Sequence, residues 1–301
     1  METLRLKSPA DGLELSVLVR EAEGTPLRTV QIVHGMCEHK ERYIPFMDFL
    51  AAHGCTCVIH DHRGHGASVK EPEDLGYMYK GGWKAMVEDI GAVAEWTAAN
   101  FSGMKHNLLG HSMGSMAVRS FTKRHDDMID SLFVVGSPSD NPAKGAGRFL
   151  AGCISLFRGE KHRPALLQKL SFGSYNKPFR NEGWHSAWVC SDKDILEEYH
   201  NDPLCQFRFT ANGFSNLMGL MQDCYSPKGW EVRNPGLPVH FLSGADDPCM
   251  ISEKDMEKAV SLMKRAGYSS ADCTLYPGMR HEILNERGKE TVWNDILERL
   301  V

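Results

Sequence analysis

A serine between two glycines is the strongest chemical signal in this 301-residue chain. Residues 110–114 read Gly-His-Ser-Met-Gly and fit the pattern G-x-S-x-G, in which a serine occupies a sharp turn from a strand into a helix. The turn needs small neighbours because its two backbones nearly touch, and glycine supplies that room and tolerates strained dihedral angles. The pattern therefore predicts Ser112 as a nucleophile whose hydroxyl is held clear of a sheet.

A serine hydroxyl is a weak nucleophile, so a base must take its proton and an acid must fix the tautomer of that base. In chains with this turn the acid follows the serine and the histidine comes last. The strand-like segment 237–242 leads into Asp246 and Asp247, and the segment 272–276 leads into His281. Because sites in open α/β sheets lie at the carboxyl ends of the strands, we expect these side chains to meet there.

Two adjacent aspartates compete for the role of the acid. The spacing Gly-x-x-Asp-Pro favours Asp247, and Pro248 would stiffen its loop. Asp246 remains the alternative, and in the favoured assignment it is a solvated or structural residue. The expected catalytic set is therefore Ser112, Asp247 and His281.

Two backbone N–H groups are also needed to stabilise the oxyanion that forms when a serine attacks a carbonyl group. One should come from Met113, the residue after the serine. The other should come from the loop 34–36, which follows the strand-like segment 29–33, and Met36 is its natural donor. The side chains of both methionines would also line the pocket.

Short apolar strands and amphipathic helices alternate along most of the chain and must position these residues. Strands are expected at 4–6, 13–19, 29–33, 55–60, 105–109, 131–135, 237–242 and 272–276, and helices at 41–52, about 83–94, 113–125, 252–266 and about 291–300. This alternation predicts a mainly parallel sheet covered by helices on both faces.

The alternation breaks after Ser137 and Pro138 and resumes near Leu237. Glycine, proline, tryptophan and phenylalanine are common in between, and no clear strand is found there. We predict one α/β core formed by residues 1–137 and 228–301, with a helical cap, residues 138–227, inserted into it.

Composition and charge exclude several classes of protein. A hydrophobic content of 42% and a charged content of 24% are ordinary for a soluble globular protein, and a net charge of -5 argues against nucleic-acid binding through a basic field. Nine cysteines without a C-x-x-C pair favour free thiols over disulfides or a zinc site. The N-terminus lacks the apolar core of a signal peptide, and no run reaches the ~20 residues of a membrane span. We expect a cytoplasmic enzyme.

Four stretches together resemble the monoacylglycerol lipase and lysophospholipase-like branch of the α/β-hydrolases, the serine aminopeptidase-like hydrolase family. They are HGMCEH (34–39) with Arg42 and Tyr43, DHRGHGAS (61–68), GHSMG (110–114) and YPGMRHE (276–282). The resemblance implies an α/β-hydrolase fold with a helical cap between the sixth and seventh core strands. It also implies Ser112 as nucleophile, Asp247 as acid and His281 as base. Cys37 replaces a residue that is often small in the family, so it lines the acyl pocket or is inert.

The histidines of the pattern H-x-H-x-x-H at 60–65 invite a metal-site interpretation. The usual pattern of metallo-hydrolases places an aspartate before the last histidine, where this chain has Gly64. We interpret the stretch as a structural turn in which Asp61 and Arg63 hold neighbouring loops, and we expect neither a metal nor a cofactor.

The cap contains an apolar run, 149–157, between Arg148 and Arg158. It is either a lid helix that touches lipid or a helix packed on its neighbours, and packing is favoured because the run is short for firm anchoring. We therefore expect at most transient membrane contact. Five cap aromatics either line an apolar pocket or pack between cap and core, namely Trp184, Trp188, Phe207, Phe209 and Phe214.

The expected activity is hydrolysis of a carboxylic ester through an acyl-enzyme, without a cofactor. The apolar cap and the resemblance favour a small-molecule substrate such as a monoacylglycerol, a lysophospholipid or a comparable medium to long acyl ester. A peptidase with the same three residues is an alternative, and it would need an acidic patch in the cap, for which candidates are Asp192, Asp194, Glu197 and Glu198. A metal-dependent hydrolase and a non-catalytic binding protein are further alternatives, although no member of the expected set is missing.

Overall fold

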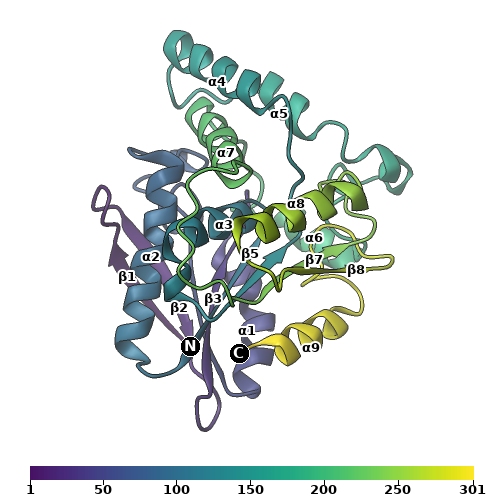
Figure 1. The fold of residues 1–301 in the computed structure, drawn as a ribbon. Coiled ribbons are helices and arrows are strands. Elements are labelled where there is room, and N and C mark those ends of the chain that lie inside the picture. The colour runs from purple at the N-terminus through teal and green to yellow at the C-terminus, as the bar shows by residue number, and fades with distance from the viewer.

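The computed structural model describes residues 1–301, which form one eight-stranded sheet with helices on both faces (Figure 1). The order in the sheet is β1-β2-β4-β3-β5-β6-β7-β8. The strands are β1 (Glu2–Lys7), β2 (Glu14–Arg20), β3 (Arg28–Val33), β4 (Cys55–His60), β5 (Lys105–His111), β6 (Ser131–Val135), β7 (Val239–Gly244) and β8 (Asp272–Tyr276). The two pairs that involve β2 are antiparallel and the other five are parallel, so the predicted mainly parallel sheet is confirmed.

Five α-helices and three short 3₁₀ segments belong to the core beside its strands. They are η1 (Lys40–Tyr43), α1 (Ile44–Ala52), η2 (Pro72–Asp74), α2 (Gly82–Asn100), α3 (Met113–His125), η3 (Asp126–Met128), α8 (Glu253–Ala266) and α9 (Lys289–Arg299). The predicted helix 41–52 is thus split into a 3₁₀ segment and α1, with Pro45 in the first turn of α1. Ser252 precedes α8 and accepts a hydrogen bond from the Asp255 N–H, which fixes the start of that helix.

The two faces of the sheet bury separate sets of side chains because successive residues of a strand point to opposite sides. Leu108 belongs to the larger apolar cluster, with residues of α2, α3 and α8. Leu109 belongs to a second cluster, with residues of α1 and α9. The core is therefore a three-layer sandwich in which the carboxyl ends of the parallel strands share one edge.

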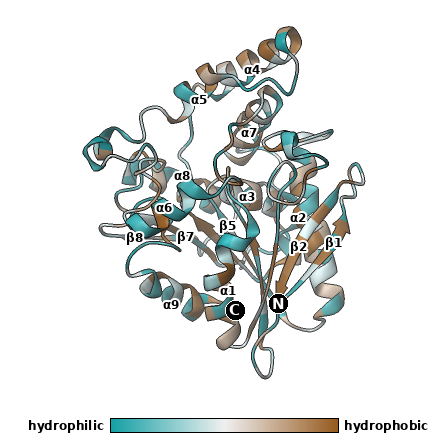
Figure 2. Ribbon diagram, turned by 180° about the vertical axis from the view of Figure 1, so that it is seen from behind, coloured by the Kyte–Doolittle hydropathy of each residue, from teal (hydrophilic) through white to brown (hydrophobic).

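Between β6 and β7 the chain forms helices and no strand. These helices are α4 (Lys144–Arg158), α5 (Ala165–Phe172), η4 (Lys177–Glu182), α6 (Lys193–Asn201) and α7 (Ala211–Cys224). Figures 1 and 2 show α4 and α5 farthest from the sheet, with α7 between α4 and the core. On this arrangement we propose a core of residues 1–137 and 228–301 and a cap of residues 138–227.

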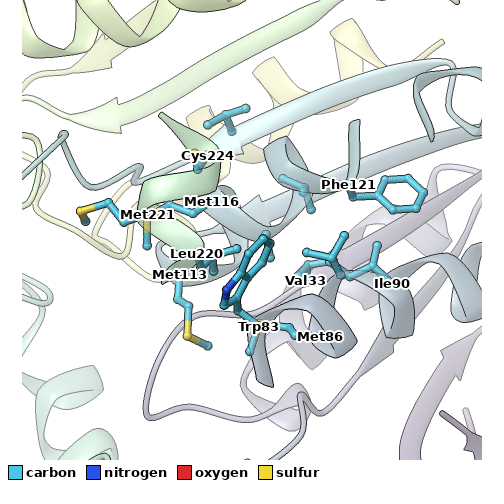
Figure 3. Close-up of a cluster of buried hydrophobic side chains, with 14 of the residues drawn as sticks. Val33, Trp83, Met86, Ile90, Met113, Met116, Phe121, Leu220, Met221 and Cys224 are labelled. Atoms are coloured by element: carbon cyan, nitrogen blue, oxygen red, sulfur yellow. The ribbon is translucent and has the colours of Figure 1, made fainter. Parts of the chain in front are cut away.

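Helix α7 packs directly on the core (Figure 3). Its side chains Leu220 and Met221 belong to the same buried cluster as Met113 and Met116 of α3 and Trp83 of α2. The inner helix of the cap is thus fixed by the same apolar packing that holds the helix after Ser112.

The turn after β4 ties several loops together, as the sequence predicts. The Asp61 carboxylate accepts hydrogen bonds from Lys40 Nζ at 2.7 Å and from the Ala67 N–H at 2.8 Å. The buried Arg63 guanidinium contacts Asp89 at 2.9 Å and Asp11 at 3.1 Å. These contacts hold the N-terminal hairpin, the turn and α2 against one another.

The three histidines of this turn are buried and do not form a set of converging ligands. Burial lowers the pKa of His60 and of His65 to about 4 and lowers that of His62 well below its usual value, so all three are neutral near pH 7. None of the three histidines belongs to a group of three or more side chains whose possible ligand atoms all lie within 4.8 Å of one another.

The apolar run 149–157 forms most of α4, which packs on α7 as favoured from the sequence, while part of its apolar surface stays exposed. Ala151 is buried and Leu150 packs on the larger cluster. In contrast, Phe149 and Leu156 are 76% and 79% exposed. Helix α4 is therefore apolar on both its inner and its outer side. None of the helices has the combination of length and apolarity that a membrane span requires.

Candidate active site

Ser112 lies in the turn between β5 and α3 with φ 53° and ψ -117°, a conformation that is strained for a residue with a side chain. A Cβ added to Gly110 would collide with the backbone of Gly114, and one added to Gly114 would collide with the backbone oxygen of Val33. Both glycines of the pattern are therefore required by close approach of the backbone, as the sequence predicts.

The three residues predicted to act together are brought into contact. Ser112 Oγ lies 2.8 Å from His281 Nε2, and His281 Nδ1 lies 2.9 Å from Asp247 Oδ2. These residues follow β5, β7 and β8, so the meeting point is the carboxyl edge of the sheet. When His281 Nδ1–H donates to the carboxylate, Nε2 is left to accept the proton of the serine hydroxyl.

The structure distinguishes the two adjacent aspartates. Asp247 is buried, and its carboxylate also accepts hydrogen bonds from the Cys249 N–H at 2.8 Å and from the Ser243 hydroxyl at 3.3 Å. The Asp246 side chain is exposed. Asp247 is the aspartate in contact with His281, and its other contacts fix the carboxylate in that position.

The loop that carries Met36 lies against the nucleophile. A Cβ added to Gly35 would lie 3.0 Å from the Cβ of Ser112. The Met36 N–H donates no hydrogen bond within the protein. Met113 is the first residue of α3, where an N–H has no acceptor within the helix. Two backbone donors without helical or strand partners are thus found beside the serine.

A buried network connects this loop to the loop of His281. Glu38 accepts hydrogen bonds from the Gly35 N–H, from the Tyr43 hydroxyl at 3.1 Å and from His111 Nδ1 at 3.0 Å. His111 Nε2 lies 3.3 Å from the backbone oxygen of His281. Because both of these neighbours are acceptors, they favour the doubly protonated form of the His111 ring.

The charged residues of this network stabilise one another's ionised forms. Burial alone would lower the pKa of His111, but the Glu38 carboxylate raises it above its usual value. Burial alone would raise the pKa of Glu38, but His111 and Arg42 together lower it. Arg42 also binds both carboxylate oxygens of Glu282, at 2.6 and 2.7 Å. The residue after His281 is thereby held by the same network.

We expect Glu38→Gln to lower the free energy of unfolding by about 3 kcal/mol, because it leaves buried His111 without its counter-charge and Arg42 with Glu282 alone. Urea denaturation at neutral pH measures the change. The control is Glu23→Gln, which removes an exposed carboxylate 2.7 Å from Arg20 and should cost under about 1 kcal/mol. Equal, small losses in the two variants would contradict a stabilising role for the network.

A cavity of about 520 Å³ lies between the cap and the core. Its wall includes Ser112, His281 and both methionines, Met36 and Met113, and Cys37 also lines it. Sixteen of its 31 lining residues are hydrophobic, so the space beside the serine suits an apolar group of a substrate.

The five cap aromatics divide between lining and packing. Trp188 and Phe207 line the cavity, and the Trp188 ring lies 5.1 Å from the His281 ring. Phe209 and Phe214 belong to the larger buried cluster instead, and the Trp184 ring stacks on a histidine of α6. Two of the five aromatics thus line the pocket, and the other three pack against neighbouring side chains.

The acidic cap residues proposed for a peptidase do not line the cavity; they are Asp192, Asp194, Glu197 and Glu198. The carboxylates that do line it belong to Glu38 and Glu282, and both face Arg42 in the network. Analysis of the sequence missed the roles of these three residues, although Glu38 and Arg42 lie in the first motif of the resemblance.

Two groups of side chains could offer three ligands to a metal ion. One is His39, Asp202 and Cys205, and the other is Asp247, Cys249 and His281. In each group the histidine already hydrogen-bonds a carboxylate: His39 Nε2 lies 2.6 Å from Asp202, and His281 Nδ1 lies 2.9 Å from Asp247. Two of the three candidate ligands in each group thus already bind one another.

The comparisons with known proteins agree with this geometry. The family model described as serine aminopeptidase, S33, matches residues 24–288. The chain belongs to this family. The resemblance drawn from the four motifs and the predicted α/β-hydrolase fold are confirmed.

Relatives of this S33 family member include lipases and an esterase. It is 31% identical to human monoglyceride lipase over 281 residues, which cover 92% of this chain and 82% of that protein. It is 25% identical to the monoacylglycerol lipase of Mycolicibacterium smegmatis, with coverage of 92% and 89%. A thermostable carboxyl esterase from Bacillus coagulans shares the fold with a TM-score of 0.90 at 21% identity, over 100% of this chain and 99% of that chain.

Proposed function

We propose that the protein hydrolyses carboxylic esters, with Ser112 as the nucleophile, His281 as the general base and Asp247 as the acid that orients it. The observation on which this proposal rests is a continuous chain of two hydrogen-bond contacts: Ser112 Oγ contacts one ring nitrogen of His281, and Asp247 contacts the other. Membership of the S33 family and the relatives named as monoacylglycerol lipases support ester hydrolysis.

The proposed reaction uses groups of the chain and water. His281 Nε2 takes the proton of Ser112 as its oxygen attacks the ester carbonyl, and the N–H groups of Met36 and Met113 stabilise the resulting oxyanion. The C–O bond to the alcohol then breaks, and the alcohol leaves with the proton from His281. Water attacks the acyl-enzyme, its proton passes through His281 to the serine oxygen, and the carboxylic acid is released.

The substrate we propose is a medium or long acyl ester of a small alcohol, such as a monoacylglycerol or a lysophospholipid. The hydrophobic lining of the cavity supports an acyl chain, and Leu217, Met218 and Met221 of α7 contribute to that lining. A peptide substrate would need a free carboxylate for its amino terminus, and the two carboxylates of the wall already face Arg42. The geometry therefore favours an ester over a peptide.

A substrate panel tests this proposal. We expect octanoyl and longer p-nitrophenyl esters and monoacylglycerols to be cleaved with higher kcat/KM than acetyl esters, because each added methylene buries apolar surface in the cavity. Aminoacyl p-nitroanilides should be cleaved slowly if at all, and a chelator should leave ester turnover unchanged. Faster cleavage of the amides, or loss of ester turnover with the chelator, would contradict the proposal.

A further inference from the structure

A histidine of the core meets an aspartate and a cysteine of the cap. His39 directly precedes η1, and Asp202 and Cys205 lie between α6 and α7. The possible ligand atoms of these three side chains all lie within 4.8 Å of one another, and we call the three residues the His39 group. No local motif indicates this group, because its histidine and its aspartate are 163 positions apart in the chain.

Further hydrogen bonds hold the nitrogen and oxygen ligands of the His39 group in place. His39 Nε2 lies 2.6 Å from Asp202 Oδ2, and its other ring nitrogen, Nδ1, lies 2.7 Å from a carboxylate oxygen of Glu41. The second oxygen of Asp202, Oδ1, accepts a hydrogen bond from the Leu204 N–H at 2.8 Å. Histidines that bind metals usually donate their other N–H to a carboxylate, and carboxylates that bind metals are themselves hydrogen-bonded. The outer contacts of the His39 group are therefore those of a metal site.

The other candidate group, Asp247, Cys249 and His281, lacks this arrangement. The second ring nitrogen of His281 lies 2.8 Å from Ser112 Oγ and has no carboxylate as its partner. The side chains of His281 and Asp247 are 5% and 0% exposed, whereas that of Asp202 is 27% exposed. An ion can thus reach the His39 group from solvent, and its binding there leaves the proposed nucleophile and base free.

The three ligand types of the His39 group select zinc. Magnesium and calcium prefer oxygen ligands, whereas a tetrahedral set of nitrogen, oxygen and sulfur suits zinc. A neutral imidazole, a carboxylate and a thiolate carry two negative charges, which balance those of Zn²⁺. Zinc bonds of about 2.0 Å to nitrogen and oxygen hold these ligand atoms about 3.3 Å apart, so the contact of 2.6 Å opens by about 0.7 Å. Water takes the fourth position.

We propose that the His39 group binds one Zn²⁺ ion through His39 Nε2, Asp202 Oδ2 and Cys205 Sγ. The ion replaces two protons, the one on the Cys205 thiol and the one between His39 Nε2 and the carboxylate, and both protons pass to water. Because the histidine belongs to the core and the other two ligands belong to the cap, the bound ion cross-links the cap to the core.

The cross-link lies beside the cavity. Cys205 and Phe207 of the cap line the cavity, and the Cys37 thiol donates a hydrogen bond to the backbone oxygen of Phe207 at 3.2 Å. Cys37 directly follows Met36, whose N–H is a proposed donor to the oxyanion. A bound ion therefore fixes the wall of the cavity next to that donor. Only this consequence rests on the proposed function; the binding of zinc does not.

Titration with zinc tests the proposal on the full chain, after a chelator has removed metals and with its thiols kept reduced. We expect calorimetry to give one Zn²⁺ per chain with a Kd below about 10 μM. Free zinc at a hundredfold excess over Kd should raise Tm by about 5 °C, and Mg²⁺ and Ca²⁺ should leave it unchanged. Cobalt(II) in place of zinc should give a thiolate charge-transfer band. Ester turnover should not change when the ion is removed, because Ser112 and His281 are not its ligands.

Two variants probe the ligands and their outer partners. Cys205→Ser should weaken zinc binding at least a hundredfold and remove the cobalt charge-transfer band, because the thiolate is lost. Glu41→Gln keeps all three ligands and should weaken binding at least tenfold, because His39 loses the carboxylate that orients it. Far-ultraviolet circular dichroism before the titration checks the folding of each variant. The Glu41 side chain is 46% exposed, so this variant decides the test if Cys205→Ser does not fold.

Matched controls separate the His39 group from the other candidate. Cys249→Ser makes the same chemical change in the group of Asp247 and His281, and it should bind zinc as the wild type does. Ser112→Ala should also bind zinc like the wild type, so a failed hydrolase proposal would leave this test intact.

Three outcomes would overturn the zinc proposal. One is a Kd above about 10 μM for zinc, or no rise of Tm at the stated excess. Another is wild-type affinity in both Cys205→Ser and Glu41→Gln. The third is loss of zinc binding in Cys249→Ser, which would assign the ion to the group of Asp247 and His281.

Discussion

Replacing Ser112 by alanine is expected to reduce kcat for the best ester of the panel by about 10⁶-fold, because the attacking oxygen is removed. The control is Ser120→Ala in α3, the helix that follows Ser112, which removes a buried hydroxyl that has no hydrogen-bond partner. This control should keep its activity, since its hydroxyl does not line the cavity. Steady-state rates on purified proteins with equal far-ultraviolet circular dichroism measure the difference. Retention of more than about 1% of kcat by Ser112→Ala would exclude this serine as the nucleophile.

Replacing Asp247 by asparagine is expected to reduce kcat by about 10⁴-fold with little change in KM. The amide cannot hold the proton on Nδ1 of His281 as the carboxylate does, so Nε2 no longer accepts the proton of the serine. The measurement is kcat and KM for one p-nitrophenyl ester across a range of pH.

The neighbouring aspartate supplies the control for that prediction. Asp246→Asn makes the same chemical change one residue away, on an exposed side chain, and should leave kcat within about twofold. A large loss in Asp246→Asn with a small loss in Asp247→Asn would reverse the assignment of the acid.

Most of the core could be predicted from local patterns, because each strand and helix has its own periodicity. The α3 bounds, Met113–His125, agree with the predicted 113–125. Strand β7 differs from the predicted 237–242 at both ends. It starts at Val239, directly after a proline that cannot donate to the ladder, and it continues to Gly244, which pairs with Tyr276.

The contact of Ser112, Asp247 and His281 was predictable because each residue follows a strand of one sheet at a recognisable turn. The network around them was not, since its partners are far apart in the chain. Glu38 meets His111 across 73 positions and Arg42 meets Glu282 across 240. Nothing in the local pattern of either segment indicates its partner.

The cap shows a second limit of periodicity. The run 149–157 is apolar on both sides of α4, so its pattern predicts a helix but cannot distinguish the side that packs on α7 from the side that faces outward. The exposure of Phe149 and Leu156 is visible only once the neighbouring helices are in place.

Labelling with a fluorophosphonate, followed by mass analysis of the peptides, tests the central claim most directly. We expect a single adduct on Ser112, no adduct in Ser112→Ala, and labelling of His281→Gln that is slower by orders of magnitude, because the probe reacts with a serine activated by its histidine. An unlabelled wild type that hydrolyses esters, or an adduct on another residue, would contradict the claim.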